Sequence, residues 1–377
     1  YYSPRRINTW QAVSEQDAVE ELQTRLKQSV ALRLRSDVEV GTCLSGGLDS
    51  SSIAIFASAL YHPDVQHNFT GITAGSIDAT KDETRYAWQV AGGLGMNWKH
   101  CKPGLPDYEQ AFARVMEIQE EPFDSSSVIM QHFVMQLAHQ TGLKVLLDGQ
   151  GADELLLGYK QHLAWAIKAL APMPAMKLAL KSLNKYQVGL KELMLLVAYH
   201  TEAKRKRKRQ LSKWKGLRNE LKDQLQAEAE SEARQPSDLF SLQCHELTHR
   251  ILPMLLRYED KNAMAYSIET RLPFLDPDLV EFLLNLPVQH KVNDGWSKYV
   301  LRKAIADSLP PEIVWRKGKV GFEAGWNAMG IMGNVNRVDP ASVNDLFQPG
   351  LRKKHFVGTN EGFRFACIVK WMDSFDK

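Results

Sequence analysis

The chain has 377 residues, of which 44% are hydrophobic and 24% are charged. These are the values of an ordinary folded protein, and the length is enough for two or three subdomains with a buried core. Lysine and arginine number 47 against 44 aspartate and glutamate residues. The resulting net charge of +3 does not favour nucleic acid or an anionic membrane as the main partner.

Cysteine usage and hydropathy indicate where the protein works. The cysteines Cys43, Cys101, Cys244 and Cys367 are scattered without paired spacing, which argues against a disulfide framework or a zinc knuckle. No window reaches the ~20 apolar residues that cross a bilayer, and the first residues lack the apolar stretch of a signal peptide. We therefore expect a cytoplasmic protein with no membrane partner.

Helix and strand signals alternate in the first half of the chain. Apolar residues at helical spacing predict a lead-in helix over 14–35, and a β-prone run follows at 38–44. A glycine-rich turn then leads into a helix at about residue 51. The elements that follow are strands at 69–73, 98–101 and 144–147, and helices at 82–94 and 131–141. This alternation predicts an α/β fold, a parallel twisted sheet with helices on both faces and its ligand outside the carboxyl ends of the strands.

Strand signals fade after about residue 159, and helical patterns dominate from there on. Helices are predicted at 238–256, 297–308 and 362–371. We therefore expect three parts: a lead-in segment and helix (1–36), an α/β core (37–165) and a mostly helical part (166–377).

A run of basic residues occupies 204–209, and the acidic segment 220–232 follows it. We interpret the two as a solvated helix or loop whose charges compensate each other. The alternative outside the enzyme class is a nucleic-acid-binding arm or a localisation signal.

The most informative segment is the run Leu44-Ser45-Gly46-Gly47-Leu48-Asp49-Ser50-Ser51. Its two glycines let a ligand approach the backbone, its serines offer hydroxyl donors, and the helix that follows points free N–H groups at the same place. Because a helix N-terminus behaves like roughly half a positive charge, the preferred ligand is a phosphate group. Asp49 would repel phosphate unless a cation lies between them, so it is a candidate Mg²⁺ ligand.

A second motif, residues 148–154, directly follows the predicted strand 144–147. It should therefore lie at the same edge of the sheet and face the first loop. Asp153 could then share a Mg²⁺ ion with Asp49, together with triphosphate oxygens and water. The sequence has no GxxxxGKS/T and no complete GxGxxG, which argues against P-loop NTPase and Rossmann folds.

These residues resemble a known family. Residues 45–50 resemble the pyrophosphate-binding loop of the N-type ATP pyrophosphatases, the PP-loop superfamily with its adenine nucleotide alpha hydrolase-like fold. The rest resembles the synthetase domain of glutamine-hydrolysing asparagine synthetases. The further matching segments are 121–126, 149–154 with Gly158 and Tyr159, 260–264 with 268–276, 298–302 and 316–322. They occur in the family's order between residues 19 and 322.

The resemblance implies ATP-dependent amide formation. A carboxylate, with the aspartate side chain as first candidate, attacks the α-phosphorus of ATP, and ammonia or an amine then displaces AMP. The implied cofactors are ATP and Mg²⁺, with Mg²⁺ on Asp49 and Asp153, and the implied partners are a small carboxylate and ammonia or an amine. Part 166–377 would complete the active site.

The resemblance also assigns roles to single residues. Lys319 matches the family's active-site lysine and would act with Asp49 and Asp153. Pyrophosphate would be held by residues 44–51 and by Gly149. The substrate-binding residues would be Gln150, Asp153 and Glu154.

Two departures from the family pattern leave alternatives open. Gln150 stands where many asparagine synthetases have an acid, and an amide can hydrogen-bond but cannot act as a base. This keeps a β-lactam or peptide macrolactam synthetase-like enzyme as an alternative. The first cysteine, Cys43, lies inside a predicted strand, so we expect the N-terminal glutaminase domain to be absent or separate. A homodimer is compatible with the sequence.

The run His245-Glu246-Leu247-Thr248-His249 spells HExxH on a predicted helix. This spacing puts both imidazoles on one helix face, as zinc proteases require. The run leads into a segment where the resembling family has a packing helix, and motifs this short arise by chance. We therefore expect a structural helix and no zinc site.

Overall fold

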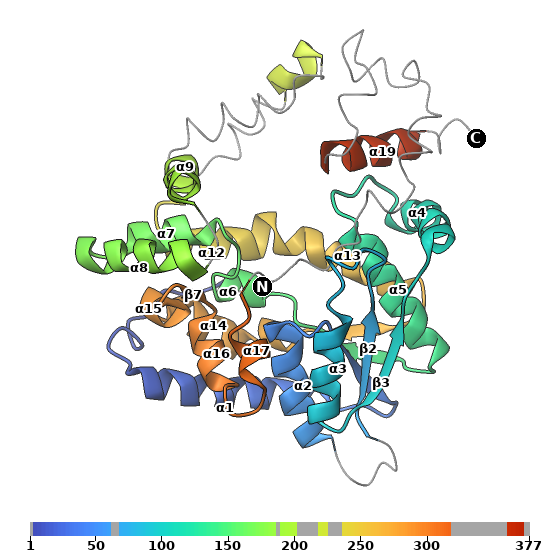
Figure 1. Cartoon of the computed structure of the whole chain (residues 1–377), viewed down its shortest axis with the longest axis horizontal. Coiled ribbons are helices and arrows are strands. Elements are labelled where there is room, and N and C mark those ends of the chain that lie inside the picture. Colours follow the sequence, from blue (N-terminus) through green and yellow to red (C-terminus); the bar gives the residue numbers. More distant parts are fainter. Residues whose placement is uncertain are drawn as a thin grey trace.

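The computed structural model describes residues 3–61, 68–185, 189–201, 218–224, 236–317 and 360–372. Within these ranges one sheet has five strands in the order β3-β2-β1-β4-β5. The strands are β1 (Val40–Cys43), β2 (Thr70–Ala74), β3 (Asn97–Cys101), β4 (Val145–Leu147) and β5 (Glu269–Arg271). Each strand is parallel to its neighbour, so the predicted α/β fold with a parallel sheet is confirmed (Figure 1).

Helices cover both faces of this sheet, as predicted. Those of the first half are α1 (Glu15–Arg33), α2 (Leu48–Leu60), α3 (Thr84–Gly93), α4 (Leu105–Gln119), α5 (Ser127–Gln140) and α6 (Ala152–Leu155). Side chains of α2 and α3 share one hydrophobic core with β1, and side chains of α4 and α5 share another with β2.

The part of the chain after residue 160 is mostly helical. Its helices are α7 (His162–Ala169), α8 (Pro172–Lys185), α9 (Leu190–Thr201), α12 (Leu239–His245), α13 (Leu252–Met264), α14 (Pro277–Asn285), α15 (Val288–Lys291), α16 (Tyr299–Ala304), α17 (Pro311–Val314) and α19 (Asn360–Met372). Two short strands, β6 (Val292–Asn293) and β7 (Trp296–Ser297), pair antiparallel before α16. The 3₁₀ turn η2 (Pro273–Leu275) joins β5 to α14.

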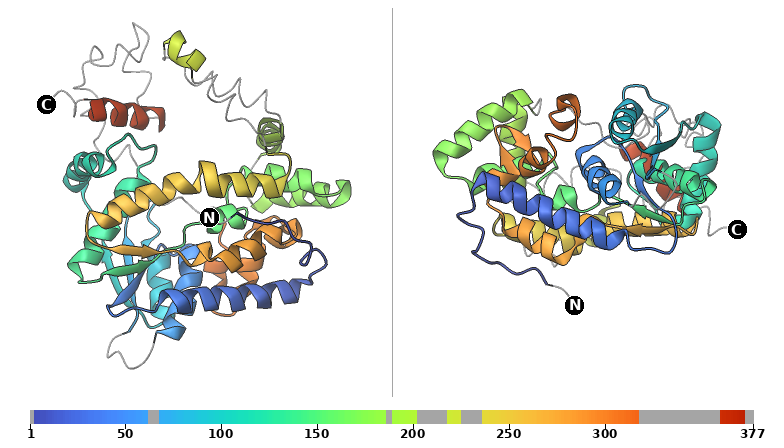
Figure 2. Two further views of the ribbon diagram at one scale, coloured as in Figure 1. Left: turned by 180° about the vertical axis from the view of Figure 1, so that it is seen from behind. Right: turned by 90° about the horizontal axis from the view of Figure 1, so that it is seen from below.

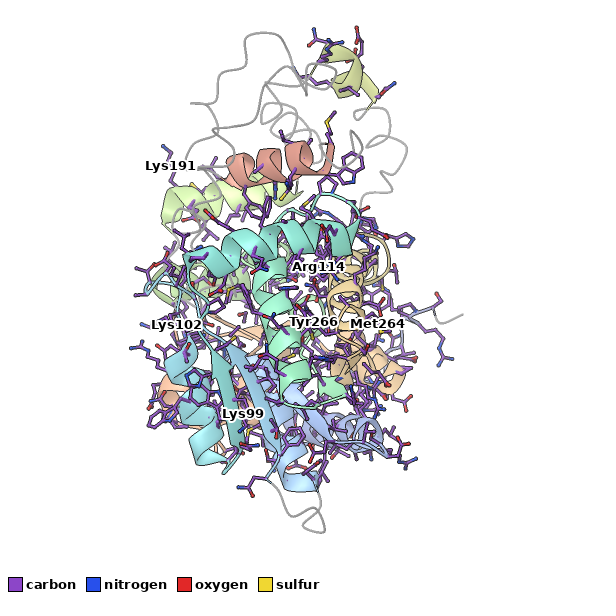
Figure 3. The ribbon with its side chains drawn as sticks, turned by 90° about the vertical axis from the view of Figure 1, so that its right-hand side faces the viewer. Lys99, Lys102, Arg114, Lys191, Met264 and Tyr266 are labelled. Atoms are coloured by element: carbon purple, nitrogen blue, oxygen red, sulfur yellow. The ribbon has the colours of Figure 1, made fainter. Side chains whose placement is uncertain are left out.

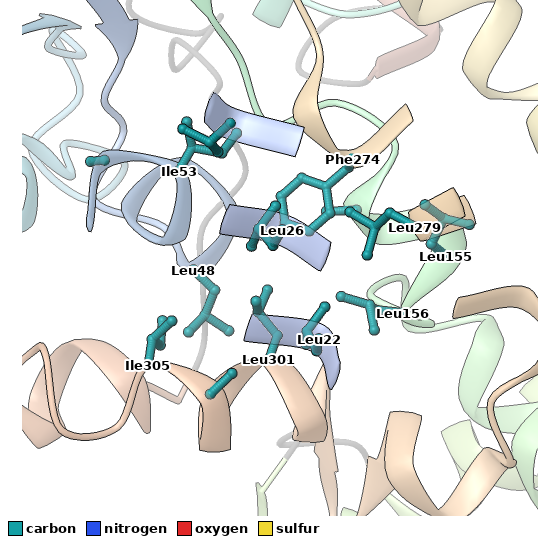
Figure 4. Packing of buried hydrophobic residues seen from close by; sticks show 14 of the residues in the cluster. Leu22, Leu26, Leu48, Ile53, Leu155, Leu156, Phe274, Leu279, Leu301 and Ile305 are labelled. Carbon is teal, nitrogen blue, oxygen red and sulfur yellow. The ribbon is translucent and has the colours of Figure 1, made fainter. Parts of the chain in front are cut away.

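The lead-in helix α1 forms as predicted. Ser14 caps it by accepting the N–H of Asp17 at 3.1 Å, which satisfies one of the free donors of the first turn. Leu22, Leu26 and Val30 recur at helical spacing and are fully buried. They meet side chains of α2, α6, α14 and α16 in one core (Figure 4). The view from behind shows α1 beneath α14 and α16 (Figure 2), so this helix joins the two halves of the chain.

Alternation along β4 explains how the sheet separates two cores. Val145 and Leu147 belong to the core that contains α2, whereas Leu146 belongs to the core that contains α5. Successive side chains of a strand point to opposite faces, so a run of apolar residues indicates burial on both sides. The strand prediction for 144–147 rested on this run and is confirmed.

Two elements differ from the sequence-based expectation. Strand β5 lies in the part that was predicted to be mostly helical, and it joins the sheet through hydrogen bonds such as Glu269 N–H to Lys144 O, at 2.9 Å. The predicted single helix over 238–256 is divided into α12, a π-helical turn (Glu246–Arg250) and α13, because the proline at position 253 cannot donate within a continuous helix. The division of the chain at residue 165 stays a prediction.

Strand β3 forms one edge of the sheet. Figure 3 looks onto the β3 edge, where Lys99 and Lys102 mark the strand and its exit, Arg114 marks α4 and Tyr266 follows α13. Within the described ranges, no helix combines the length and the apolar character that crossing a membrane requires.

Candidate active site

The two predicted loops meet at the carboxyl edge of the sheet. Strand β1 pairs with β2 on one side and β4 on the other, so the strand order reverses between β1 and β4. Loops at such a switch point diverge to opposite faces and leave a crevice for a ligand. The contact is close: a Cβ atom on Gly149 would lie 2.9 Å from Cβ of Asp49 and 3.2 Å from N of Ser50. Only glycine fits there.

The loop after β1 is shaped to receive an anion. Gly46 has φ +72°, a conformation that L side chains rarely adopt. Gly47 is the N-cap of α2 and offers no side-chain acceptor, so the first N–H groups of this helix need an outside partner. The Ser51 hydroxyl is buried without a hydrogen-bond partner among the described residues. A phosphate group would satisfy the free N–H groups at the start of α2.

Three charged side chains converge beside this loop. Asp49 in the first turn of α2 accepts two hydrogen bonds from Nζ of Lys298, at 2.7 and 2.6 Å. Asp153 in α6 lies 2.5 Å from the same nitrogen. The structure therefore brings the two predicted carboxylates together, with the ammonium group of Lys298 between them.

Lys298 is almost completely buried, with 5% of its side chain exposed. Burial alone would lower the pKa of Lys298, but Asp153 and Asp49 outweigh it and raise the pKa above its ordinary value. The lysine is therefore charged at neutral pH. Its backbone has φ 53°, the left-handed region, which costs of order 1 kcal/mol for a residue other than glycine. Strain of this kind persists where the surrounding structure fixes the residue.

The arrangement suits a divalent cation shared with phosphate. Two carboxylates against one ammonium leave a net negative charge beside a loop that attracts anions. Within the described ranges, no cluster of three or more His, Cys, Asp or Glu side chains could hold a metal by itself. Mg²⁺ is usually held by one or two carboxylates, with phosphate oxygens and water completing its shell. Asp49 and Asp153 meet that requirement.

Helix α6 is held in place from behind. Gln243 of α12 donates to the backbone oxygens of Glu154 and Leu155, at 2.7 and 2.8 Å. Nζ of Lys291 donates to the amide oxygen of Gln243 at 2.7 Å. Glu154 itself accepts a hydrogen bond from the Tyr159 hydroxyl at 2.8 Å. Burial, followed by the charge of Asp153, raises the pKa of Glu154 to about 7.

A cavity of about 350 Å³ opens between the two loops, α5 and α13. The predicted residues that line it are Leu44, Ser45, Asp49, Ser50, Gly149, Gln150, Asp153 and Glu154. Gly46, Gly47, Leu48 and Ser51 belong to the same loop and shape its backbone or pack beneath it. The contacts that these residues make with a ligand stay predictions.

Lys319, the predicted catalytic lysine, lies outside the described residues, as does the basic run 204–209. The approach to Lys319 is nonetheless fixed. Arg316 forms an ion pair of 2.7 Å with Glu83, and both side chains are about nine-tenths buried. Its guanidinium also lies 4.1 Å from the ring centre of Tyr86, and Tyr86 contacts Gly46. The chain is thus anchored behind the phosphate loop three residues before Lys319.

The HExxH run packs into the helical part through its glutamate, and the absence of a zinc site stays a prediction. Glu246 is buried and 2.6 Å from Nε2 of His162, which is also buried. His245 and His249 stack with ring centres 5.6 Å apart. The two histidines thus share one helix face, whereas the Glu246 carboxylate is engaged by His162 inside the protein.

Sequence reasoning missed one member of the site. The sequence places Lys298 only as the first residue of a segment that resembles the family, and it indicates no role for this lysine. Its contact with Asp49 joins residues that are far apart in the sequence, and a single lysine carries no periodic signal. The resemblance of 298–302 to the family was the one available hint.

Comparison with known proteins defines the class. The family model "Asparagine synthase" matches residues 21–354. The chain belongs to the asparagine synthase family, which confirms the resemblance found in its motifs.

Individual relatives share less than a third of their aligned residues with this chain. The chain is 28% identical to glutamine-hydrolysing asparagine synthetase 1 of Bacillus subtilis, over 82% of this chain and 50% of that protein. It is 26% identical to the amidase chyE of Penicillium rubens, over 84% of this chain and 54% of that protein. The chain spans about half the length of these curated relatives. Among solved structures, the U34-tRNA thiolase NcsA of Methanococcus maripaludis is similar with a TM-score of 0.29 and 16% identity, over 45% of this chain and 60% of that one.

Proposed function

We propose that the chain is the synthetase part of an ATP-dependent amide-forming enzyme. It would activate a carboxylate as an acyl-adenylate with release of pyrophosphate, and then join the acyl group to ammonia or an amine. The observation that carries this proposal is the convergence of Asp49, Asp153 and Lys298 beside an anion-binding loop at the switch point of the sheet.

In the first step, a carboxylate oxygen of the substrate attacks the α-phosphorus of ATP. The bond between the α-phosphorus and the bridging oxygen breaks, and pyrophosphate leaves with the electron pair. The N–H groups at the start of α2 and the serines of the loop would bind the departing phosphates. Lys298 would supply a buried positive charge next to them. Fixing the two reactants together can contribute roughly 7–11 kcal/mol towards the barrier.

Asp49 and Asp153 would hold Mg²⁺ against the triphosphate. When bound, the ion would neutralise charge that accumulates on pyrophosphate as it leaves. The two side chains lie in the first turns of different helices, α2 and α6. Lys298 would hold both carboxylates in place when the ion is away.

In the second step, the amine attacks the carbonyl carbon of the acyl-adenylate and AMP leaves. Lys319 would stabilise the charge on the reacting carbonyl, as the family resemblance implies. Aspartate is the first acyl substrate to test, because relatives are named asparagine synthetases. Four scattered cysteines without paired spacing favour a reducing, cytoplasmic setting for this reaction.

One observation favours a second candidate, a lactam synthetase-like reaction in which carboxylate and amine belong to one molecule. The cavity wall carries the neutral Gln150, together with Val128, Val134 and Leu255. This uncharged part of the lining could receive an apolar stretch between the carboxylate and the amine of one substrate.

The test is carboxylate-dependent exchange of labelled pyrophosphate into ATP. Exchange requires only the first step and does not depend on the amine. We expect exchange with Mg²⁺ and one acid of a panel that contains aspartate, other amino acids and β-amino acids. Exchange with aspartate would favour asparagine formation, whereas exchange with a longer amino acid alone would favour the lactam reaction. Absence of exchange with every acid would refute the proposal.

A further inference from the structure

A buried ion pair joins the residues just after α17 to the start of α3. Nη2 of Arg316 lies 2.7 Å from Oε1 of Glu83, and only 10% and 12% of the two side chains are exposed. Glu83 is the N-cap of α3, whereas Arg316 follows α17 by two residues. The pair therefore holds together two segments that are 233 residues apart in the chain.

The ion pair reaches the loop between β1 and α2 through α3. The guanidinium of Arg316 lies 4.1 Å from the ring centre of Tyr86, and a Cβ atom on Gly46 would lie 2.7 Å from Cβ of Tyr86. Glu83 and Ser45 line the same small cavity. Because packed interiors transmit displacements, a shift of Arg316 would be felt by the loop that we expect to bind the polyphosphate.

A second arginine fixes the same segment from the other side. Arg302 on α16 donates from Nε to the backbone oxygen of Ser297 at 2.9 Å, and from Nη1 to that of Val314 at the end of α17. Helix α16 begins directly after Lys298, whose ammonium group lies between the two carboxylates of the site. The helix that brings Lys298 into the site thus also holds the chain that leads to Arg316.

Stability alone does not explain the ion pair. Burying two charges costs free energy that their attraction only partly offsets. Nη1 of Arg316 is buried and has no hydrogen-bond partner among the described residues, and an unsatisfied donor in a native protein calls for another explanation. The planar guanidinium contacts a carboxylate and an aromatic ring at once, so its direction is fixed. Such a group is suited to anchoring the chain that follows it.

We propose that Arg316 and Glu83 are positioning residues for Lys319, and that their ion pair aligns the segment carrying this lysine with the loop between β1 and α2. The inference rests on the proposed function and on the role of Lys319 in the amide-forming step. Lys319 follows Arg316 by three residues, and three residues of chain span at most about 11 Å. A fixed Arg316 therefore limits the region in which Lys319 can act. Neither Arg316 nor Glu83 is among the residues that line the cavity between the two loops.

The test is a double-mutant cycle between the ion pair and the lysine. We expect Arg316→Gln to lower kcat of amide formation by about 10²-fold, the cost of displacing a reacting group by about 1 Å. ATP affinity should stay within a few-fold of wild type. In the Lys319→Ala background the same substitution should lower kcat by less than about two-fold, because a lysine that is absent cannot be displaced. Glu83→Gln should behave like Arg316→Gln in both backgrounds.

A control variant separates positioning from a general loss of stability. Equilibrium ATP binding counts the active molecules, and kcat is expressed per binding site. Arg33→Gln is the matched control, because Arg33 forms a largely buried ion pair with Asp276, at 3.1 Å, elsewhere in the chain. It should lower Tm, leave kcat unchanged, and have the same effect with and without Lys319.

Three outcomes would overturn the inference. If the losses in Arg316→Gln and Lys319→Ala multiply in the double variant, Arg316 acts independently of the lysine. A wild-type kcat in Arg316→Gln excludes a positioning role. If ATP affinity falls as much as kcat, the ion pair only supports the loop between β1 and α2.

Failure of the inference and failure of the proposed function give different results. A wild-type kcat in Lys319→Ala would refute the role of Lys319 and the inference together, while pyrophosphate exchange by the wild-type chain would still support the proposed function. If the wild-type chain shows no exchange with any carboxylate, the proposed function itself fails and the inference falls with it.

Discussion

Lys298 and Asp49 are 249 residues apart in the chain, yet Nζ of Lys298 donates to both carboxylate oxygens of Asp49. The contact joins the start of α16 to the first turn of α2, so the helical part and the phosphate loop fix each other. Both side chains are largely buried. Changes to these charges should therefore be visible in stability as well as in activity.

The two carboxylates should be separately essential. We expect Asp49→Asn and Asp153→Asn each to abolish Mg²⁺-dependent pyrophosphate exchange. In each variant the Mg²⁺ ion would lose one of its two carboxylate ligands, and the triphosphate charge would stay uncompensated. Circular dichroism should show an intact fold. Asp307→Asn, at an exposed position, is the control and should exchange like wild type. Normal exchange in either active-site variant would remove the metal assignment.

Replacing the lysine should make stability depend on Mg²⁺. In Lys298→Met the two carboxylates face each other without a cation, and breaking a buried ion pair costs about 3–5 kcal/mol. We expect a lower Tm than wild type in EDTA and a larger rise of Tm on addition of MgCl₂. Lys303→Met on the same helix, where the lysine pairs with Glu15 at the surface, should show neither effect. An equal response of Lys298→Met and wild type to MgCl₂ would mean that the carboxylates do not bind the ion.

Replacing Lys319 should lower kcat strongly, whereas replacing Lys317 should not. A cation that acts where charge develops in the transition state is worth ~2.7–4 kcal/mol, or about 10²–10³ in rate. We expect Lys319→Ala to lower kcat by that factor with a much smaller change in ATP affinity, because the loop 44–51 holds the polyphosphate. Lys317→Ala should change neither quantity. Steady-state kinetics and equilibrium ATP binding of the two variants decide the matter, and similar small effects would show that the role belongs elsewhere.

The phosphate loop should not tolerate a side chain at Gly46. A Cβ atom there would overlap the backbone nitrogen of Ala87 and lie 2.6 Å from the carbonyl carbon of Tyr86, and φ is positive. We expect Gly46→Ala to lose ATP binding and more than ~1 kcal/mol of unfolding free energy. Gly93→Ala is the matched control, because a Cβ at Gly93 has open space around it. Titration with ATP and urea unfolding measure the two effects, and equal behaviour of the variants would contradict the loop geometry.

Glu154 should make stability fall as pH rises. Its folded-state pKa of about 7 lies above the ordinary 4.5, so the folded state holds a proton that the unfolded chain has lost. Its contribution is therefore complete below pH 4.5 and disappears as pH rises through 7, by up to about 3 kcal/mol. Glu154→Gln removes this component. Between pH 5 and pH 8, urea unfolding should show a larger decrease in unfolding free energy for wild type than for Glu154→Gln. Equal decreases would mean that Glu154 is ionised in the folded protein.

The loop between β1 and α2 could be located from the sequence because its signals are local. Glycines, serines and an acid between a strand and a helix are contiguous from residue 44 to residue 51. The placement of Asp153 beside Asp49 followed from one further rule, that loops after parallel strands share an edge. The predicted strands rested in the same way on short apolar runs such as 144–147.

Other features depend on contacts that no local pattern encodes. Glu269, Thr270 and Arg271 are polar and too few to read as a strand, and they form β5 only because β4 offers a free edge. Lys298 becomes part of the site through the fold of α16 against α2. The burial of the Glu259 carboxyl depends equally on how α13 packs against the rest of the chain.

Strand β5 is synthesised long after the strand with which it pairs, so the sheet is completed late during translation. The backbone edge of β4 is covered by residues 269–271, which leave the ribosome about 120 residues after β4 does. At ~5–20 residues per second this delay is roughly 6–24 seconds. During that time the nascent chain exposes an apolar, hydrogen-bonding edge of the kind that recruits other strands. The cell must therefore keep the β4 edge from pairing with other nascent chains until residues 269–271 have been made.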